Sequence, residues 1–296
     1  MVLTSITLWT ILLLVVALLY YVRRVEPNRL KTEAVPVPVS GLPAELRGLK
    51  IAHLSDMHLR ESEQSISISR QAVAEIMTRQ PDLICITGDV AHRSECVDLA
   101  CKVLSPLAAE HGAYAVLGNH DMDQSLELTW FCEKTREIAP AEWVTRMAAI
   151  GVDLLLNEHR CLRVRGRLVV IVGIGDPSCG YDDLEKALSG APRGDLNILL
   201  SHSPDIFDNP RVEWANLVLC GHTHGGQVQL PGIGAPWAPV WRGRRRAAGL
   251  MRVGERTVAY VSRGIGSGTL ARLNCPPEVT MLTMDAGDAA NMKMVR

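Results

Sequence analysis

The segment LKIAHLSDMH at residues 49–58 runs from an apolar stretch into polar side chains that can bind a metal ion. Four later segments repeat this pattern: LICITGD at 83–89, AYAVLGNHD at 113–121, NILLSH at 197–202 and NLVLCGHTH at 216–224. Their near-continuous Ile, Leu and Val content is typical of strands covered on both faces. In open α/β sheets, ligands bind beyond the carboxyl ends of such strands. The pattern therefore predicts an α/β fold that gathers these polar side chains at one edge.

These motifs, in the order D-x-H, GD, GNHD, a single His and GHTH, resemble those of the calcineurin-like metallophosphoesterase superfamily. The resemblance covers about residues 47–284 and implies a two-sheet α/β sandwich. GHTHGGQ at 221–227, LPGIG at 230–234 and CPPE at 275–278 are similar to the membrane-anchored bacterial branch. That branch includes UDP-diacylglucosamine diphosphatases of lipid A synthesis.

The resemblance also implies two divalent metal ions. Asp89 would bridge them. The coordination of one ion would be completed by Asp56, His58 and His224, and that of the other by Asn119, His202 and His222. This mixed nitrogen and oxygen set suits manganese, iron or zinc better than magnesium or calcium. Two cations about 4 Å apart screen the charge of a phosphoryl group and acidify a water, so we expect a phosphoester hydrolase without a covalent phosphoenzyme.

His120 follows a predicted ligand directly, so we expect its imidazole to lie at the site without binding metal. Held there by Asp121, it could donate a proton to the leaving oxygen or stabilise charge on the phosphoryl group. His120 and Asp121 are therefore the predicted catalytic pair.

Other polar residues near strand ends have simpler interpretations. A single histidine after a strand is usually packed or capping, and we expect this of His53, His92, His111 and His159, although His53 could still lie near the metals. Asp176 could face the site, but a turn with Pro177 is the favoured interpretation.

The amino terminus carries the uncharged apolar stretch Val2 to Val22, about 30 Å long as a helix, which matches the hydrocarbon core of a bilayer. It lacks the basic start and small-x-small site of a cleaved signal peptide, and a buried core helix is rarely so uniformly apolar. Basic residues follow the stretch and none precedes it: Arg23, Arg24, Arg29 and Lys31. The positive-inside rule then predicts a single-pass protein of the inner (cytoplasmic) membrane with a cytoplasmic catalytic domain.

We expect an anchor at 1–22, a Pro-rich linker at 23–46, one metallophosphoesterase domain at 47–285 and a loose tail at 286–296. Helical composition occurs at 65–79, 94–110, 141–150 and 181–188, and further strands are predicted at 168–174, 257–261 and 279–284. The eight cysteines show no C-x-x-C pair, and we expect free thiols.

Net charge is −1, which disfavours nucleic acid as a partner. An anchored hydrolase gains most when its substrate is also in the bilayer. We therefore expect membrane lipid as the partner and a lipid-linked phosphate as the substrate. The resemblance favours cleavage of UDP-diacylglucosamine to UMP and an acylated sugar phosphate. A general phosphodiesterase of envelope glycolipids or phospholipids is the alternative, and a non-catalytic scaffold on this fold is the less favoured one.

The sequence says least about which residues contact the substrate. Trp237 and Trp241 stand beside Arg242 and Arg244 to Arg246, so this segment is a candidate membrane-facing rim, or else an ordinary loop with a solvated charge cluster. Arg263 and Arg272 could bind a phosphate. Three aromatic side chains could line an acyl groove, although core contacts of a cap helix are favoured for them: Trp130, Phe131 and Trp143.

Overall fold

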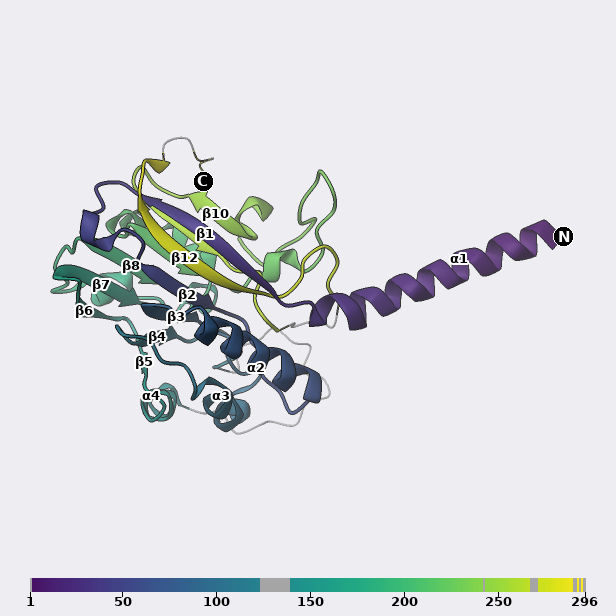
Figure 1. Cartoon of the computed structure of the whole chain (residues 1–296), viewed down its shortest axis with the longest axis horizontal. Coiled ribbons are helices and arrows are strands. Elements are labelled where there is room, and N and C mark those ends of the chain that lie inside the picture. Colours follow the sequence, from purple (N-terminus) through teal and green to yellow (C-terminus); the bar gives the residue numbers. More distant parts are fainter. Residues whose placement is uncertain are drawn as a thin grey trace.

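Two six-stranded sheets pack face to face in the computed structural model, with helices on their outer faces and one long helix projecting from the body (Figure 1). The structure describes residues 2–122, 139–241, 243–266, 271–289, 292 and 294. Trp130, Phe131 and Arg242 lie outside the described residues. The predicted two-sheet α/β sandwich is confirmed.

The first sheet carries the strands that precede the D-x-H, GD and GNHD motifs. Its strand order is β1-β12-β2-β3-β4-β5, and β2 to β5 are parallel whereas β12 is antiparallel to β2. The bounds are β1 Lys31–Val39, β12 Glu278–Ala286, β2 Lys50–Leu54, β3 Leu83–Thr87, β4 Ala113–Val116 and β5 Val152–Leu154.

The second sheet carries the strands that precede Ser-His and GHTH. Its order is β10-β11-β9-β8-β7-β6, with parallel pairing from β11 to β7 and an antiparallel strand at each edge. The bounds are β10 Gly249–Arg252, β11 Val258–Val261, β9 Leu217–Cys220, β8 Leu196–Leu200, β7 Arg167–Gly173 and β6 Glu158–Val164. Our sequence analysis missed β5, β6 and β10, because β5 is short and the two edge strands are only partly buried.

The main core lies between the sheets. Ile51 and Cys85 of the first sheet belong to the same buried cluster as Ile198 and Leu219 of the second. Burying one such aliphatic side chain contributes about 1.5–3 kcal/mol. The strands are thus buried on both faces, which explains why they lack polar alternation. The cysteines of the described segments are all free, as expected.

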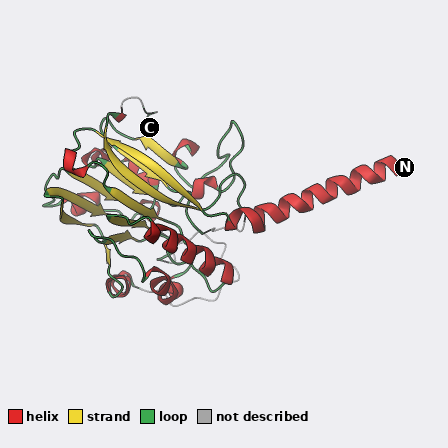
Figure 2. Ribbon diagram, viewed as in Figure 1, coloured by secondary structure: helices red, strands yellow, loops and turns green. Residues whose placement is uncertain are grey.

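Helices close the outer faces (Figure 2). The outer face of the first sheet is covered by α2 Glu63–Thr78, α3 Val97–Leu104 and α4 Pro140–Ala148, and that of the second by α5 Leu184–Leu188. The Ser62 hydroxyl accepts the Ser65 N–H and caps α2, so this helix begins two residues before the predicted start. Trp143 is fully buried and its indole donates to the Asp121 carbonyl at 3.0 Å, which confirms the core interpretation.

The segment predicted as a linker contains β1, and that prediction is corrected. β1 pairs in parallel with β12 along its whole length, and Val37 and Val39 are buried in the main core. Pro36 and Pro38 suggested an open linker, yet proline fits an edge strand because that strand has one side without ladder partners. The tail prediction also fails at its start, since β12 extends to Ala286 and Ala289 is buried.

The projecting helix α1, Val2–Tyr20, continues into a π turn at Tyr21–Val25 and a 3-10 turn at Glu26–Asn28. Among the described residues, one helix is long and apolar enough to cross a membrane, and a signal sequence would pass the same test. Its root is tied to the domain: the Arg272 N–H donates to the Val22 carbonyl at 2.9 Å, and the buried Glu26 carboxylate accepts the Cys275 N–H at 2.8 Å.

Two amino-terminal truncations should separate the anchor from the fold. Deleting residues 2–20 removes exposed α1 and should yield a folded domain. Deleting residues 2–40 also removes buried Val37 and Val39, which should lower the melting temperature by at least about 6 °C relative to the shorter deletion. Differential scanning calorimetry checks this, and equal melting temperatures would mean that β1 adds nothing to stability.

Candidate metal centre

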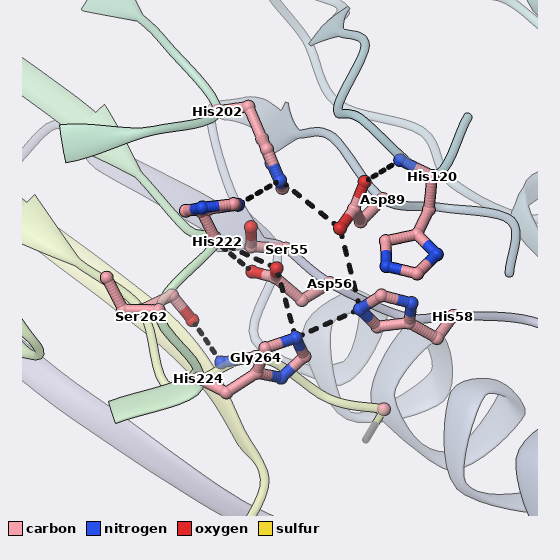
Figure 3. Close-up of polar contacts among 12 residues, drawn as sticks. Ser55, Asp56, His58, Asp89, His120, His202, His222, His224, Ser262 and Gly264 are labelled. Atoms are coloured by element: carbon pink, nitrogen blue, oxygen red, sulfur yellow. Dashed lines mark hydrogen bonds and ion pairs between the residues drawn. The ribbon is translucent and has the colours of Figure 1, made fainter. Parts of the chain in front are cut away.

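The carboxyl ends of strands from both sheets meet at one edge and bring the predicted ligands together (Figure 3). The first sheet contributes Asp56 and His58 after β2, Asp89 after β3 and Asn119 after β4; the second contributes His202 after β8 and His222 and His224 after β9. Direct contact joins the two halves, because the His222 backbone N–H donates to both carboxylate oxygens of Asp56, at 2.9 and 3.1 Å. The site therefore exists only where the sandwich closes.

One cluster consists of Asp56, His58 and His224, whose potential ligand atoms lie within 4.8 Å of one another. The Nε2 atoms of His58 and His224 are 2.9 Å apart, and His224 Nε2 is 3.5 Å from Asp56 Oδ1. All three side chains are almost completely buried. Their ring nitrogens and carboxylate thus point at one shared position.

A second cluster consists of Asp89, His202 and His222. His202 Nε2 lies 3.2 Å from Asp89 Oδ2 and 3.2 Å from His222 Nδ1. Asp89 Oδ2 is also 3.5 Å from His58 Nε2 of the first cluster. Asp89 therefore lies between the clusters, where the bridging ligand was expected.

The donor set fits a metal pair. Ligands at about 2.1 Å from an ion lie about 3.0 to 3.4 Å apart in octahedral or tetrahedral geometry, close to the separations just given. Asn119 Oδ1 is buried and has no hydrogen-bond partner among the described residues, as a ligand oxygen would be without its ion. The nitrogen and oxygen mixture supports a dinuclear site and leaves the metal's identity open among manganese, iron and zinc.

The ligand loops adopt a costly backbone conformation. Positive φ angles between 44° and 67° occur at Asp56, His58, Asp89, His222 and His224. For residues other than glycine such angles cost about 1–3 kcal/mol each and persist where the surroundings impose them, often at functional sites. Gly88 is part of these surroundings, because a Cβ there would lie 2.6 Å from both the Gly118 nitrogen and His202 Nδ1.

Electrostatics single out one ion pair within the site. Burial raises the pKa of Asp89, but the charge and hydrogen bond of His202 outweigh burial and hold it well below its usual range. Burial lowers the pKa of His202, yet the Asp89 charge raises it well above its usual value, and a cation bound between these two side chains would replace the proton on His202. Burial depresses the pKa of His58 and His224 strongly, so both imidazoles are neutral and offer lone pairs to a cation.

Outer contacts orient the ligands. His202 Nδ1 pairs with the Thr87 carbonyl at 2.7 Å, which directs Nε2 to the site. Arg272 is fully buried behind His224, with its Nη2 atom 3.4 Å from His224 Nδ1 and bonded to the Arg263 and Gly264 carbonyls. Arg272 thus supports the ligand loops, and the expected direct contact with substrate phosphate is not available to it.

His120 borders the site but is held differently from our expectation. Its backbone N–H donates to Asp89 Oδ1 at 2.9 Å, and its Nδ1 pairs with the His92 carbonyl at 3.1 Å. The Asp121 carboxylate instead accepts the N–H groups of Ala91 and Gly118, at 2.9 and 3.0 Å. Asp121 therefore positions the GNHD loop and does not hold the His120 ring, because its oxygens are already used by the backbone.

The remaining histidines divide between site and scaffold. His92 packs its ring against those of His58 and His120, at centroid distances of 5.9 and 5.5 Å, so it is a packed residue that also borders the site. His53 is buried, with Nε2 2.8 Å from Thr87 Oγ1, and burial lowers its pKa to about 3, which confirms a packed residue. His53 lies within β2 whereas His92 follows the end of β3, and the sequence pattern alone did not show which of them would border the site.

Three further predicted residues lie away from the ligands. Arg263 forms ion pairs with Glu33 and Glu278, so its charge is used between β1 and β12. Trp237 and Trp241 are 69% and 81% exposed, as a surface rim requires.

Asp176 makes the turn that our sequence analysis favoured. Its carboxylate accepts the Ser178 N–H at 2.9 Å and the Ser178 hydroxyl at 2.8 Å, capping the 3-10 turn Pro177–Cys179. In the rim segment, Arg246 is buried and pairs with Asp208, so it does not belong to an exposed basic cluster.

Comparisons with known proteins agree with this geometry. The family described as calcineurin-like phosphoesterase matches residues 49–226. The chain is 35% identical to Phosphodiesterase YaeI of Escherichia coli over 238 residues, which cover 79% of this chain and 82% of YaeI. It is 26% identical to UDP-2,3-diacylglucosamine pyrophosphatase LpxG of Chlamydia trachomatis over 326 residues, 93% of this chain and 95% of LpxG. It is 31% identical to a transmembrane protein with metallophosphoesterase domain of Bos taurus over 272 residues, 85% of this chain and 56% of that protein.

Asp89→Asn should remove metal from the folded protein, because the neutral amide loses the charge shared by both clusters. We expect bound manganese, measured by elemental analysis after gel filtration, to fall by at least about tenfold, as loss of one charged ligand costs more than about 1.4 kcal/mol. His111→Ala is the matched control, since His111 lies away from the clusters. Full metal content in Asp89→Asn, with unchanged circular dichroism, would contradict the bridging role.

Proposed function

This chain belongs to the calcineurin-like phosphoesterase family, and on that basis we propose that it is a membrane-bound hydrolase of lipid-linked phosphate esters or anhydrides. The general activity, metal-dependent phosphoester hydrolysis, follows from the family and from the paired His and Asp clusters. The lipid part of the proposal rests on one observation: the apolar helix α1 is tied at Val22 and Glu26 to the segment that backs the ligand His224.

The residues of the site suit hydrolysis by water. When bound, a metal pair supplies positive charge for the phosphoryl oxygens and acidifies a water molecule. Asp89 holds the two ligand clusters together, and the buried walls keep the site dry enough for its charges to act strongly. His120 Nδ1 donates its hydrogen to the His92 carbonyl, so the ring can act as an acid only in its doubly protonated form, in which Nε2 carries the proton that would pass to the leaving oxygen.

Within this class, UDP-diacylglucosamine is our specific candidate, cleaved to UMP and the acylated sugar phosphate. The similarity to LpxG over most of both chains supports it. The higher identity to YaeI supports the alternative, a phosphodiesterase acting on envelope glycolipids or phospholipids. The scaffold alternative is disfavoured, because the predicted Asp and His ligands are all present and lie in two adjoining clusters.

A second apolar surface supports the membrane location. The loop 230–241 exposes four large hydrophobic side chains: Leu230, Ile233, Trp237 and Trp241. Its base pairs with Leu273 and Asn274, next to the Arg272 N–H that binds the anchor root. We place α1 across the inner membrane and this loop at the bilayer surface. The arginines that follow α1 favour a cytoplasmic catalytic domain.

Full-length protein with manganese should release UMP from UDP-diacylglucosamine. A chelator and the Asp89→Asn variant should each reduce the rate at least about a hundredfold, since both remove the electrostatic stabilisation of the transition state. Chromatographic quantification of UMP checks this. If UMP is absent while bis(p-nitrophenyl) phosphate is hydrolysed in a chelator-sensitive way, the specific substrate is wrong and the phosphodiesterase alternative stands.

His120→Ala should separate acid catalysis from metal binding. General acid catalysis contributes about 10²–10⁴-fold, so kcat should fall within that range while bound manganese stays at the wild-type level. Steady-state kinetics and elemental analysis of the same preparation give both values. Loss of metal in this variant would show instead that His120 is a ligand.

A further inference from the structure

A cleft of about 470 Å³ adjoins the metal centre at the root of the anchor. His58 of the first metal cluster forms one wall, and Arg24 and Pro27 from the anchor root form another. The start of α2 and the loop after β11 complete the lining with Ile68 and Ile265. The cleft therefore joins the predicted metal site to the point where the chain leaves the membrane helix.

Two arginines from different parts of the chain line this cleft. Arg60 follows His58 by two residues, whereas Arg24 comes from the π turn below α1. Glu63 is also on the wall, so the cleft is not uniformly cationic. Guanidinium groups recognise phosphate through paired N–H donors, and two of them beside a metal ligand are suited to an anionic group next to the one that reacts.

The backbone around Arg24 is held in place, unlike that of an ordinary juxtamembrane arginine. On one side, the Val22 carbonyl accepts the Arg272 N–H at 2.9 Å. On the other side, the buried Glu26 carboxylate accepts a hydrogen bond from the Cys275 N–H, and Pro27 is buried as well. The backbone at Arg24 is thus fixed beside the cleft while its side chain is exposed, so binding a ligand would have to order the side chain but not the backbone.

The cleft also has a small apolar part. Pro27, Ile68 and Ile265 belong to its lining, together with the polar residues Ser62, Glu63, Gln64 and Ser65, and could contact the carbon skeleton of a headgroup. Because α1 leaves the body at the same place (Figure 1), a lipid whose chains stay in the bilayer would present its headgroup here. A soluble phosphate ester would use the arginines without the apolar surface.

We infer that this cleft is a headgroup subsite for an anionic amphiphile, in which Arg24 and Arg60 bind a phosphate adjacent to the group held at the metal centre. The inference rests on the proposed function and makes it more specific. The substrate class becomes a membrane lipid with two neighbouring anionic groups, or one phosphoanhydride, in its headgroup. Hydrolysis at the metal centre would then occur with the second anionic group held by the two arginines.

The test measures binding of a long-chain alkyl methylenebisphosphonate, a non-hydrolysable amphiphile with two neighbouring anionic groups, to full-length, manganese-loaded protein in phosphocholine micelles by calorimetry. Arg24→Gln and Arg60→Gln should each raise Kd by about tenfold, the effect of losing one charged hydrogen-bonded contact. Arg23→Gln is the matched control, because Arg23 is exposed in the same turn and does not line the cleft. It should change Kd by less than about twofold.

Inorganic phosphate distinguishes the two sources of the anion. Its Kd should change by less than about twofold in Arg24→Gln and Arg60→Gln, because free phosphate can bind at the metals without the arginines. If its Kd rises as much as that of the amphiphile, the cleft is a site for free phosphate and the lipid inference is overturned. Equal affinity for the amphiphile in Arg24→Gln and Arg23→Gln would overturn it as well.

Hydrolysis of bis(p-nitrophenyl) phosphate by the wild-type protein keeps this test separate from the proposed function. Chelator-sensitive hydrolysis of that ester reports on the metal centre alone and needs no lipid. If hydrolysis is present and the arginine variants bind the amphiphile normally, the subsite inference fails and the hydrolase proposal stands. If hydrolysis is absent and the variants lose binding of the amphiphile, the subsite stands and the hydrolase proposal fails.

Discussion

A buried carboxylate between two groups of imidazoles is the interaction on which the rest of the site depends. Asp89 is 2% exposed, and a buried charge needs partners of opposite charge or hydrogen-bond donors. His202 and the His120 backbone N–H supply them from opposite sides of the sandwich. Ligands from two sheets must reach one small volume around Asp89. The positive φ angles of the ligand loops and the close approach of Gly88 to Gly118 and His202 follow from this requirement. The stability given up in those loops is offset by the core between the sheets, which has no catalytic role.

The turns that follow α1 are joined to the catalytic domain through the segment 272–275. Arg272 contacts both the Val22 carbonyl and the ring of His224. The Cys275 N–H donates to the Glu26 carboxylate, and the Cys275 thiol lies 3.2 Å from the His224 carbonyl. Under our proposal that α1 spans the membrane, this joint would orient the metal centre relative to the bilayer, whereas a flexible tether would only raise its concentration at the surface. The exposed apolar loop 230–241 is joined to the same segment, so the bilayer would contact the protein at two connected places.

The sequence predicted the central strands, and it named the Asp and His residues that the structure brings together, because both depend on local patterns. Continuous apolar runs mark β2, β3, β8 and β9, and each ligand follows its strand within a few residues. β1 was missed because Val-Pro alternation suggests a linker, and only its pairing with β12 shows that it is an edge strand. His92 and His53 show the same limit for side chains. His53 lies within β2 and pairs with Thr87, whereas His92 follows β3 and borders His58 and His120.

The sequence by itself determined the α/β class, the order of the metal-binding motifs and the presence of an apolar amino-terminal helix, because periodicity, spacing and composition are properties of the chain. Only the tertiary structure decided which residues act together. It placed Asp121 on the backbone of the GNHD loop, Arg272 behind His224, and Arg24 beside Arg60 in the cleft next to His58. The physical reason is that contacts between residues far apart in the chain depend on how the two sheets and the anchor root pack, and a linear pattern carries no information about that packing.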